Sequence, residues 1–335
     1  VMFKREDGTS RVEYLTYYIQ DNSSQSGISG AWFNRATISQ FTTDDPTTFH
    51  GTHTLGTMAG GYKGSSKVAS LSDAKATVAT STSPYYGMAT ESDIVASCGT
   101  LQDFFIALGM ESVLDYADQM KMPAVINLSL GGTTGPHDGT SMISEYMALA
   151  EKQDKVIICV AAGNEGDLPL VVSDTLTEGQ TEIKSFIQPI YSSYPVYNDD
   201  GSVAYTYKNL RTGQVYVYSN DSTPFTIKAV VYNKSRGKIT FQAVFSSDNE
   251  NGSIYYASEG MAQDGDLTHP NFTKAFNGYV GVGGLVDEYS GRYYAIVDYF
   301  VEDAATNDGS YTLGFVVDGA AGQRIDCYCD GSCTT

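Results

Sequence analysis

Apolar residues in the first half of the chain follow two different spacings. Val12 to Ile19 is rich in tyrosine and β-branched residues, which favours a strand. Phe104 to Met120 and Met142 to Lys152 repeat apolar residues every three or four positions, which favours helices. Ala124 to Leu130 is largely apolar and the run from Val156 is continuously so, as in strands buried on both faces. This alternation predicts the α/β fold class with a parallel doubly wound sheet.

The pattern changes after Asp167. Short strands rich in tyrosine and valine alternate with Asn-, Asp- and Gly-containing turns, and the helical spacing disappears. The predicted strands are Gln214 to Ser219, Phe225 to Tyr232, Lys238 to Ser246, Arg292 to Phe300 and Tyr311 to Val317. We therefore expect an α/β core over residues 1–169 and an antiparallel β-sandwich of jelly-roll type over residues 170–322. Residues 323–335 are expected to return to the core.

Composition and charge restrict the function. The chain has 335 residues, of which 41% are hydrophobic and 18% charged, as in a folded globular protein. No run approaches the roughly 20 apolar residues of a membrane span, and no segment resembles a signal peptide. The formal net charge of −19 argues against nucleic acid as a partner, because phosphate binding requires basic patches.

The five cysteines fall into two groups. Cys98 and Cys159 lie in predicted buried strands, where a thiol behaves as a small hydrophobic side chain. Cys327, Cys329 and Cys333 lie close together near the end of the sequence. A disulfide between two of these three is one interpretation, and a metal site is weaker because a fourth ligand is missing nearby. The sequence leaves the state of these three open.

The stretch FHGTHTLGTMAGGY, Phe49 to Tyr62, contains the first candidate catalytic residue. It places His50 at the start of a predicted helix whose Gly and Ala residues allow close packing on a neighbour. Histidine titrates near neutral pH, so His50 is a candidate general base. The alternatives are a packed histidine or a metal pair with His53. Helical metal pairs are spaced by four residues rather than three, which lowers the metal interpretation.

Two further motifs follow. AVINLSLGG, Ala124 to Gly132, is a buried strand that ends in small residues. VIICVAAGNEGD, Val156 to Asp167, is an apolar strand that delivers an asparagine amide at its carboxyl end. In this order, HGTH, NLSLGG and AAGNEG resemble the subtilisin-like serine proteases (subtilases), of the bacterial type with an inserted β-sandwich. The resemblance covers roughly residues 49–167. The segment YYGMATESDIVASCG is similar to another strand entry of the family, with Thr90 where proline is usual.

The resemblance implies roles for individual residues. His50 would be the general base and Asn164 the side-chain donor to the oxyanion, in a triad ordered Asp, His, Ser. The implied substrate is a polypeptide, with neither a metal nor another cofactor, and the implied location is extracellular or in the cell envelope. Ser129, Leu130 and Gly131 would pair with the substrate backbone, and Ala161, Ala162 and Gly163 would form a wall of the specificity pocket.

Two residues imitate the remaining triad members. Asp21 precedes His50, but Asn-Ser-Ser follows it in place of the family's Ser/Thr-Gly. Ser141 lies in Gly-Thr-Ser-Met, the spelling of the serine motif, yet it precedes Asn164 and no proline follows. We interpret Ser141 as a helix N-terminal residue. The chain is therefore expected to be an internal fragment of an endopeptidase, inactive alone, whose exposed half-core could associate. The alternative is a pseudoprotease or recognition module whose sandwich binds protein or carbohydrate.

Overall fold

The chain forms two compact units, which we call the α/β unit and the sandwich unit. The computed structural model describes residues 3–5, 7–23, 27–38, 49–61, 87–187, 192–198, 200–235, 238–247, 253–287, 290–330 and 333–334. The α/β unit comprises Val1–Gly131 and Met142–Ala162. The sandwich unit comprises Gly132–Ser141 and Gly163–Thr335. The sequence also predicts a short strand at residues 76–80, and these residues lie outside the described ranges.

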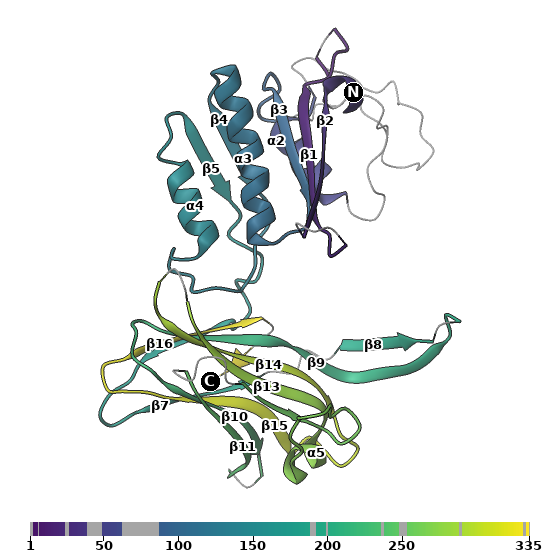
Figure 1. Ribbon diagram of the computed structural model, residues 1–335. Coiled ribbons are helices and arrows are strands. Elements are labelled where there is room, and N and C mark those ends of the chain that lie inside the picture. Colours follow the sequence, from purple (N-terminus) through teal and green to yellow (C-terminus); the bar gives the residue numbers. More distant parts are fainter. Residues whose placement is uncertain are drawn as a thin grey trace. The chain divides into compact units, whose positions relative to one another are not determined.

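From residue 94 onwards the α/β unit alternates strands and helices in the predicted order (Figure 1). Its elements are β1 (Val12–Gln20), β2 (Ile28–Asn34), α1 (Arg35–Ile38), α2 (His50–Ala59), β3 (Ile94–Gly99), α3 (Asp103–Met120), β4 (Ala124–Leu128), α4 (Met142–Ala150) and β5 (Val156–Val160). Strand β1 pairs in parallel with β3 and antiparallel with β2. Strands β4 and β5 form a second, parallel pair.

The predicted parallel pairs are present, but not as one doubly wound sheet. Among the described residues, β2-β1-β3 and β4-β5 are separate sheets, and α3 connects β3 to β4. Helix α3 buries Phe105, Met110 and Leu114, and the last two of these join a core with β4, β5 and α4. The helix ends at Lys121, which adopts a left-handed conformation with φ 57°. Periodicity thus defined the elements, but not the single sheet.

One face of the β4-β5 pair is exposed. The side chains of Ile126 and Ile158 point to the helices, whereas Val125 and Ile157 are 58% and 59% exposed. A parallel pair normally has both faces covered, so this is an unusual amount of bare apolar surface. Cys98 and Cys159 are both exposed, so the prediction that they are buried is wrong. For Cys159 the reason is the two-residue period of β5, which turns it away from the helices.

The sandwich unit consists of two antiparallel sheets (Figure 1). The larger has the order β12-β13-β14-β9-β16-β6, with β8 paired to β9, and the smaller has the order β11-β10-β15-β7-β17. The strands are β6 (Val171–Thr175), β7 (Glu182–Ile187), β8 (Ser192–Tyr197), β9 (Val203–Ser219), β10 (Thr226–Asn233), β11 (Lys238–Ser246), β12 (Ser253–Ala257), β13 (Phe276–Val286), β14 (Tyr293–Asp303), β15 (Tyr311–Asp318), β16 (Arg324–Asp330) and β17 (Cys333–Thr334).

The core of this unit lies between its two sheets. Alternate residues of β9, β14 and β16 meet those of β10 and β15, so that Val217, Val297, Ile227 and Phe315 are completely buried. Strand β9 is much longer than predicted because its first half pairs with β8 in a projecting hairpin. A short helix, α5 (Pro270–Ala275), interrupts the expected all-strand pattern. The antiparallel sandwich itself is confirmed.

The expected return of residues 323–335 to the core is wrong. Strand β16 lies inside the larger sheet, paired with β9 on one side and β6 on the other. Its alternation of buried Ile325, Cys327 and Cys329 with more exposed residues fits a sheet whose one face is covered. Cys329 is disulfide-bonded. Cys327 is a buried thiol, and burial raises its pKa. The tail therefore belongs to the sandwich.

Candidate active site

Helix α2 begins at His50, as the sequence predicts. Phe49 occupies the N-cap without a side-chain hydrogen bond, and both His50 and His53 are exposed. At the other end, the backbone approaches so closely that a Cβ on Gly87 would lie 2.4 Å from the Gly60 nitrogen. Hence the small residues serve close packing at the end of the helix, while the imidazole of His50 remains open to solvent.

Arg11 binds the carboxyl end of α2. Arg11 is 1% exposed, and its guanidinium donates to backbone carbonyls. The acceptors are Ala59, Gly61 at 2.8 Å, and Ala89 and Ser92 at 3.3 Å each. A cation at this position complements the partial negative charge of a helix carboxyl end. Burial lowers the pKa of Arg11, yet an arginine remains charged at neutral pH.

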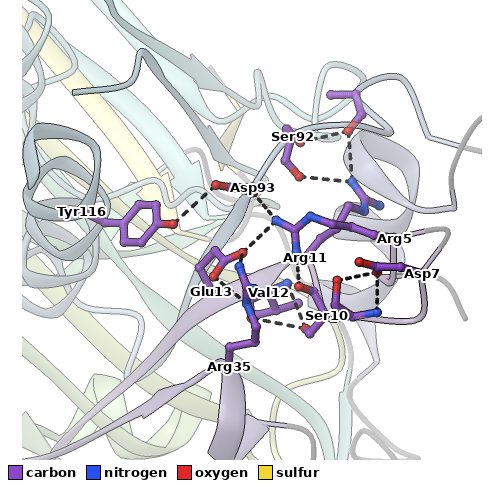
Figure 2. Close-up of polar contacts among 12 residues, drawn as sticks. Arg5, Asp7, Ser10, Arg11, Val12, Glu13, Arg35, Ser92, Asp93 and Tyr116 are labelled. Atoms are coloured by element: carbon purple, nitrogen blue, oxygen red, sulfur yellow. Dashed lines mark hydrogen bonds and ion pairs between the residues drawn. The ribbon is translucent and has the colours of Figure 1, made fainter. Parts of the chain in front are cut away.

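A charged network surrounds the starts of β1 and β3 (Figure 2). Arg5 Nη2 lies 2.8 Å from Glu13 Oε1 and 2.5 Å from Asp93 Oδ1. Arg35 also binds Glu13, and the Tyr116 hydroxyl donates to Asp93 at 3.4 Å. Ligand sites in α/β proteins lie at the carboxyl ends of strands, so we assign this network at the amino ends to stability.

The position of Arg11 indicates where His50 lies. Arg11 immediately precedes β1, and its carbonyl accepts from the Ile94 amide at 2.8 Å, so the carboxyl end of α2 is fixed near the amino ends of β1 and β3. Helices in α/β units run antiparallel to their strands. The amino end of α2, with His50, is therefore expected towards the carboxyl ends of those strands.

The carboxyl ends of β4 and β5 bring two predicted segments together. The strands are paired along their whole length, and the Ala161 amide continues the ladder by donating to the Leu128 carbonyl at 3.0 Å. The side-chain amide of Asn127 also donates to Ser129 Oγ at 2.9 Å. Residues after both strands thus line one edge of the α/β unit: Ser129, Leu130 and Gly131 after β4, and Ala161 and Ala162 after β5.

Gly163 and Asn164 belong to the sandwich unit, whereas His50 belongs to the α/β unit. Gly163 has a left-handed φ of 89°, and a Cβ there would lie 2.7 Å from Glu165 Oε2. The same carboxylate oxygen accepts from the Asn164 backbone amide at 2.7 Å. The asparagine is exposed, at the point where the chain leaves β5 for the sandwich.

Asp21 and Ser141, which resemble triad residues in sequence, have local structural roles. Asp21 follows β1, where its Oδ1 accepts from the backbone amide of Ser23 at 2.9 Å and from the Ser23 hydroxyl. Ser141 immediately precedes α4, as the helix interpretation predicted. Just before it, Asp138 Oδ1 accepts from the Thr140 amide at 3.0 Å and from the Thr140 hydroxyl at 2.7 Å. Both aspartates close short turns.

The described residues offer an imidazole, small residues beside two strand ends, and an exposed asparagine. This set could deprotonate a nucleophile and bind an extended chain, and the described residues contain no cluster of metal ligands. No helix in the described ranges is sufficiently long and apolar to cross a membrane. Arg11 was not recognisable from the sequence, because only the folded chain gathers carbonyls from α2 and the segment before β3 around it.

Comparisons with known proteins agree with the motif order. The model of the subtilase family of peptidases matches residues 32–290. The solved structure of the CspB protease of Clostridium perfringens is similar, with a TM-score of 0.58 and 16% sequence identity. The similarity covers 98% of this chain and 58% of that one, so the chain spans little more than half the length of that protease. No curated protein sequence matches the chain.

Proposed function

Because the chain belongs to the subtilase family, we propose that it forms the histidine- and asparagine-bearing part of a serine endopeptidase site. One observation carries the proposal: the segments after β4 and β5 lie side by side at the edge where an α/β enzyme binds its ligand. The substrate class is a polypeptide, as for other peptidases. The same family likeness favours an extracellular or cell-envelope protein.

In this proposal His50 is the general base. It accepts the proton of a serine hydroxyl as that oxygen attacks the scissile carbonyl, and it then donates the proton to the leaving amine. The side-chain amide of Asn164 donates to the oxyanion that forms on the carbonyl oxygen. The magnitude for such a donor, about 10²–10³ in kcat, comes from subtilisin, which is the source of the general rule rather than a result for this chain.

The substrate would bind in an extended conformation. The backbone of Ser129, Leu130 and Gly131 continues β4 and could pair with a peptide strand. The side chains of Ala161 and Ala162 and the hydrogen of Gly163 are small, so they leave room for a large apolar side chain of the substrate. His53 has no role in the chemistry.

The aspartate and the serine of the triad have no matching motif in this sequence. We therefore propose that polypeptide outside these 335 residues supplies them, and that the chain by itself does not hydrolyse peptides. A fluorophosphonate probe, which labels only activated serines, tests this. We expect no labelling of the chain alone. Stoichiometric labelling at Ser141 would instead make Gly-Thr-Ser-Met the nucleophile motif.

A longer protein that carries all three triad residues tests His50 directly. The variant His50→Ala should lose about 10⁴–10⁶ in kcat while keeping its fold. The matched control is His53→Ala on the same helix, which should retain its turnover per folded molecule. Near-normal hydrolysis by the His50 variant would remove that residue from the mechanism.

A second candidate function is recognition by the sandwich, for which we propose a jelly-roll topology. The observation that favours recognition is the β8-β9 hairpin, where Tyr197 and Tyr205 are 60% and 49% exposed. Exposed tyrosines bind both glycans and peptides with little loss of conformational entropy. Binding of glycan or peptide arrays to the chain, lost on replacing both tyrosines with serine, would support this function.

A further inference from the structure

A ten-residue excursion, Gly132–Ser141, connects the two halves of the α/β unit through the sandwich unit. It begins directly after the proposed substrate strand Ser129–Gly131 and ends at Ser141, immediately before α4. Although β4 and α4 belong to the α/β unit, the excursion packs with the sandwich. The strand proposed to hold the substrate is therefore covalently continuous with a segment that the sandwich holds.

Two contacts fasten the excursion to the larger sheet. The His137 ring stacks on Tyr328 of β16, with 4.1 Å between centroids and 8° between planes. Asp138 Oδ2 lies 2.5 Å from Arg292 Nη2, at the start of β14, and the same nitrogen lies 3.4 Å from Thr140 Oγ1. His137 is further oriented by the Thr133 carbonyl, 3.0 Å from its Nε2.

Arg292 is itself held by the sheet. Its side chain is 13% exposed, and its guanidinium lies 5.7 Å above the centroid of the Tyr218 ring on β9. The second terminal nitrogen is 3.5 Å from the Ser219 carbonyl. An ion pair that is largely shielded and supported by an aromatic ring is stronger than an exposed pair, because solvent screens it less.

We propose that Arg292 and Tyr328 are positioning residues for the substrate strand Ser129–Gly131. By fixing Asp138 and His137, they restrict the conformations of the excursion, and so of the strand that precedes it. The role as a substrate strand rests on the function proposed above, whereas the clamp itself rests on the contacts alone. The inserted sandwich thereby acts on peptide binding without contributing a reacting group.

Amide hydrogen exchange in the full chain tests the clamp without requiring activity. The reporter is the Ala161 amide, which donates to the Leu128 carbonyl just before the substrate strand. Arg292→Gln should accelerate its exchange about tenfold, the effect of one lost charge-assisted hydrogen bond, and leave β10 of the sandwich unchanged. Arg292→Lys, which keeps the charge, should restore part of the protection.

The matched control is Lys228→Gln, which removes an ion pair with Asp318 in the smaller sheet. It should accelerate exchange in β10 and not at Ala161. Unchanged exchange at Ala161 in Arg292→Gln would overturn the clamp, as would equal acceleration at Ala161 and in β10, because that is general destabilisation.

A binding measurement separates the clamp from the proposed function. The probe is a succinylated Ala-Ala-Pro-Phe anilide, added to the full chain. We expect binding that Arg292→Gln weakens about tenfold and Lys228→Gln leaves unchanged, since the lost interaction is again one charge-assisted hydrogen bond. Equal affinity in wild type and Arg292→Gln contradicts positioning. If the wild type does not bind the probe, Ser129–Gly131 is not a substrate strand and the positioning role is refuted. Faster amide exchange at Ala161 alone in Arg292→Gln would still establish the clamp.

Discussion

Replacing Arg11 with methionine should loosen the helix that carries His50. Arg11 is 1% exposed, and methionine retains much of its aliphatic length but removes the guanidinium that binds the carbonyls of Ala59 and Gly61 at the end of α2. These carbonyls then lose a buried donor, and the helix loses the cation at its carboxyl end. We expect the carboxyl end of α2 to fray first.

The magnitude follows from the contacts. A hydrogen bond from a charged donor contributes about 1.5–3 kcal/mol net, and the contacts to Ala59 and Gly61 belong to this class. The two 3.3 Å contacts share one nitrogen and contribute less. Methionine also removes the desolvation cost of the cation, which offsets part of the loss. A net loss of about 2–4 kcal/mol remains, a large part of the 5–15 kcal/mol of a typical domain.

Urea unfolding followed by tryptophan fluorescence measures this loss. Trp32 is the single tryptophan, it lies on β2 of the α/β unit, and it stacks on Tyr14 with 5.6 Å between centroids. The signal therefore reports the unit that contains Arg11. The control is Arg324→Met, whose side chain is 58% exposed in the sandwich. If Arg11→Met is as stable as wild type, or more so, desolvation outweighs the hydrogen bonds and our reasoning fails.

Three further predictions concern other parts of the chain. Burial alone would raise the pKa of Asp138, but hydrogen bonds from Thr140 and the charge of Arg292 lower it below its ordinary value. The ionised Asp138 therefore stabilises the fold fully above about pH 4, and this stabilisation disappears as the pH falls through the lowered pKa of the folded state. Thermal unfolding of Asp138→Asn should consequently depend less on pH between about 7 and 3 than that of wild type. Residues 163–335 expressed alone should unfold cooperatively and residues 170–322 should not, because the shorter piece lacks β16 between β9 and β6; a sharp calorimetric transition of the shorter piece would contradict this. Ile157→Lys should reduce self-association in sedimentation, because Ile157 is 59% exposed on the bare face of the β4-β5 pair; an unchanged monomer fraction would show that this face does not associate.

The sequence by itself determined the local elements and the family. Apolar spacing defined β1, α3, β4, α4 and β5 closely, because each element buries one face or both and its residues repeat with the period of the element. The motifs around His50, Ser129 and Asn164 were recognisable because each is contiguous, so that no knowledge of distant contacts was needed. Their catalytic roles remain a prediction.

The tertiary structure decided which segments share a unit. Residues 323–335 read as a return to the core, yet β16 belongs inside the sandwich sheet, because strand pairing depends on partners more than 100 residues away in the sequence. Gly132–Ser141 read as a local entry to a helix, yet Arg292 and Tyr328 hold it in the sandwich unit. The buried position of Arg11 likewise depends on the carbonyls of Ala59 and Gly61, which lie 48 and 50 residues further along the chain. The partners of these segments are distant in sequence, and no local pattern of polarity records such pairings.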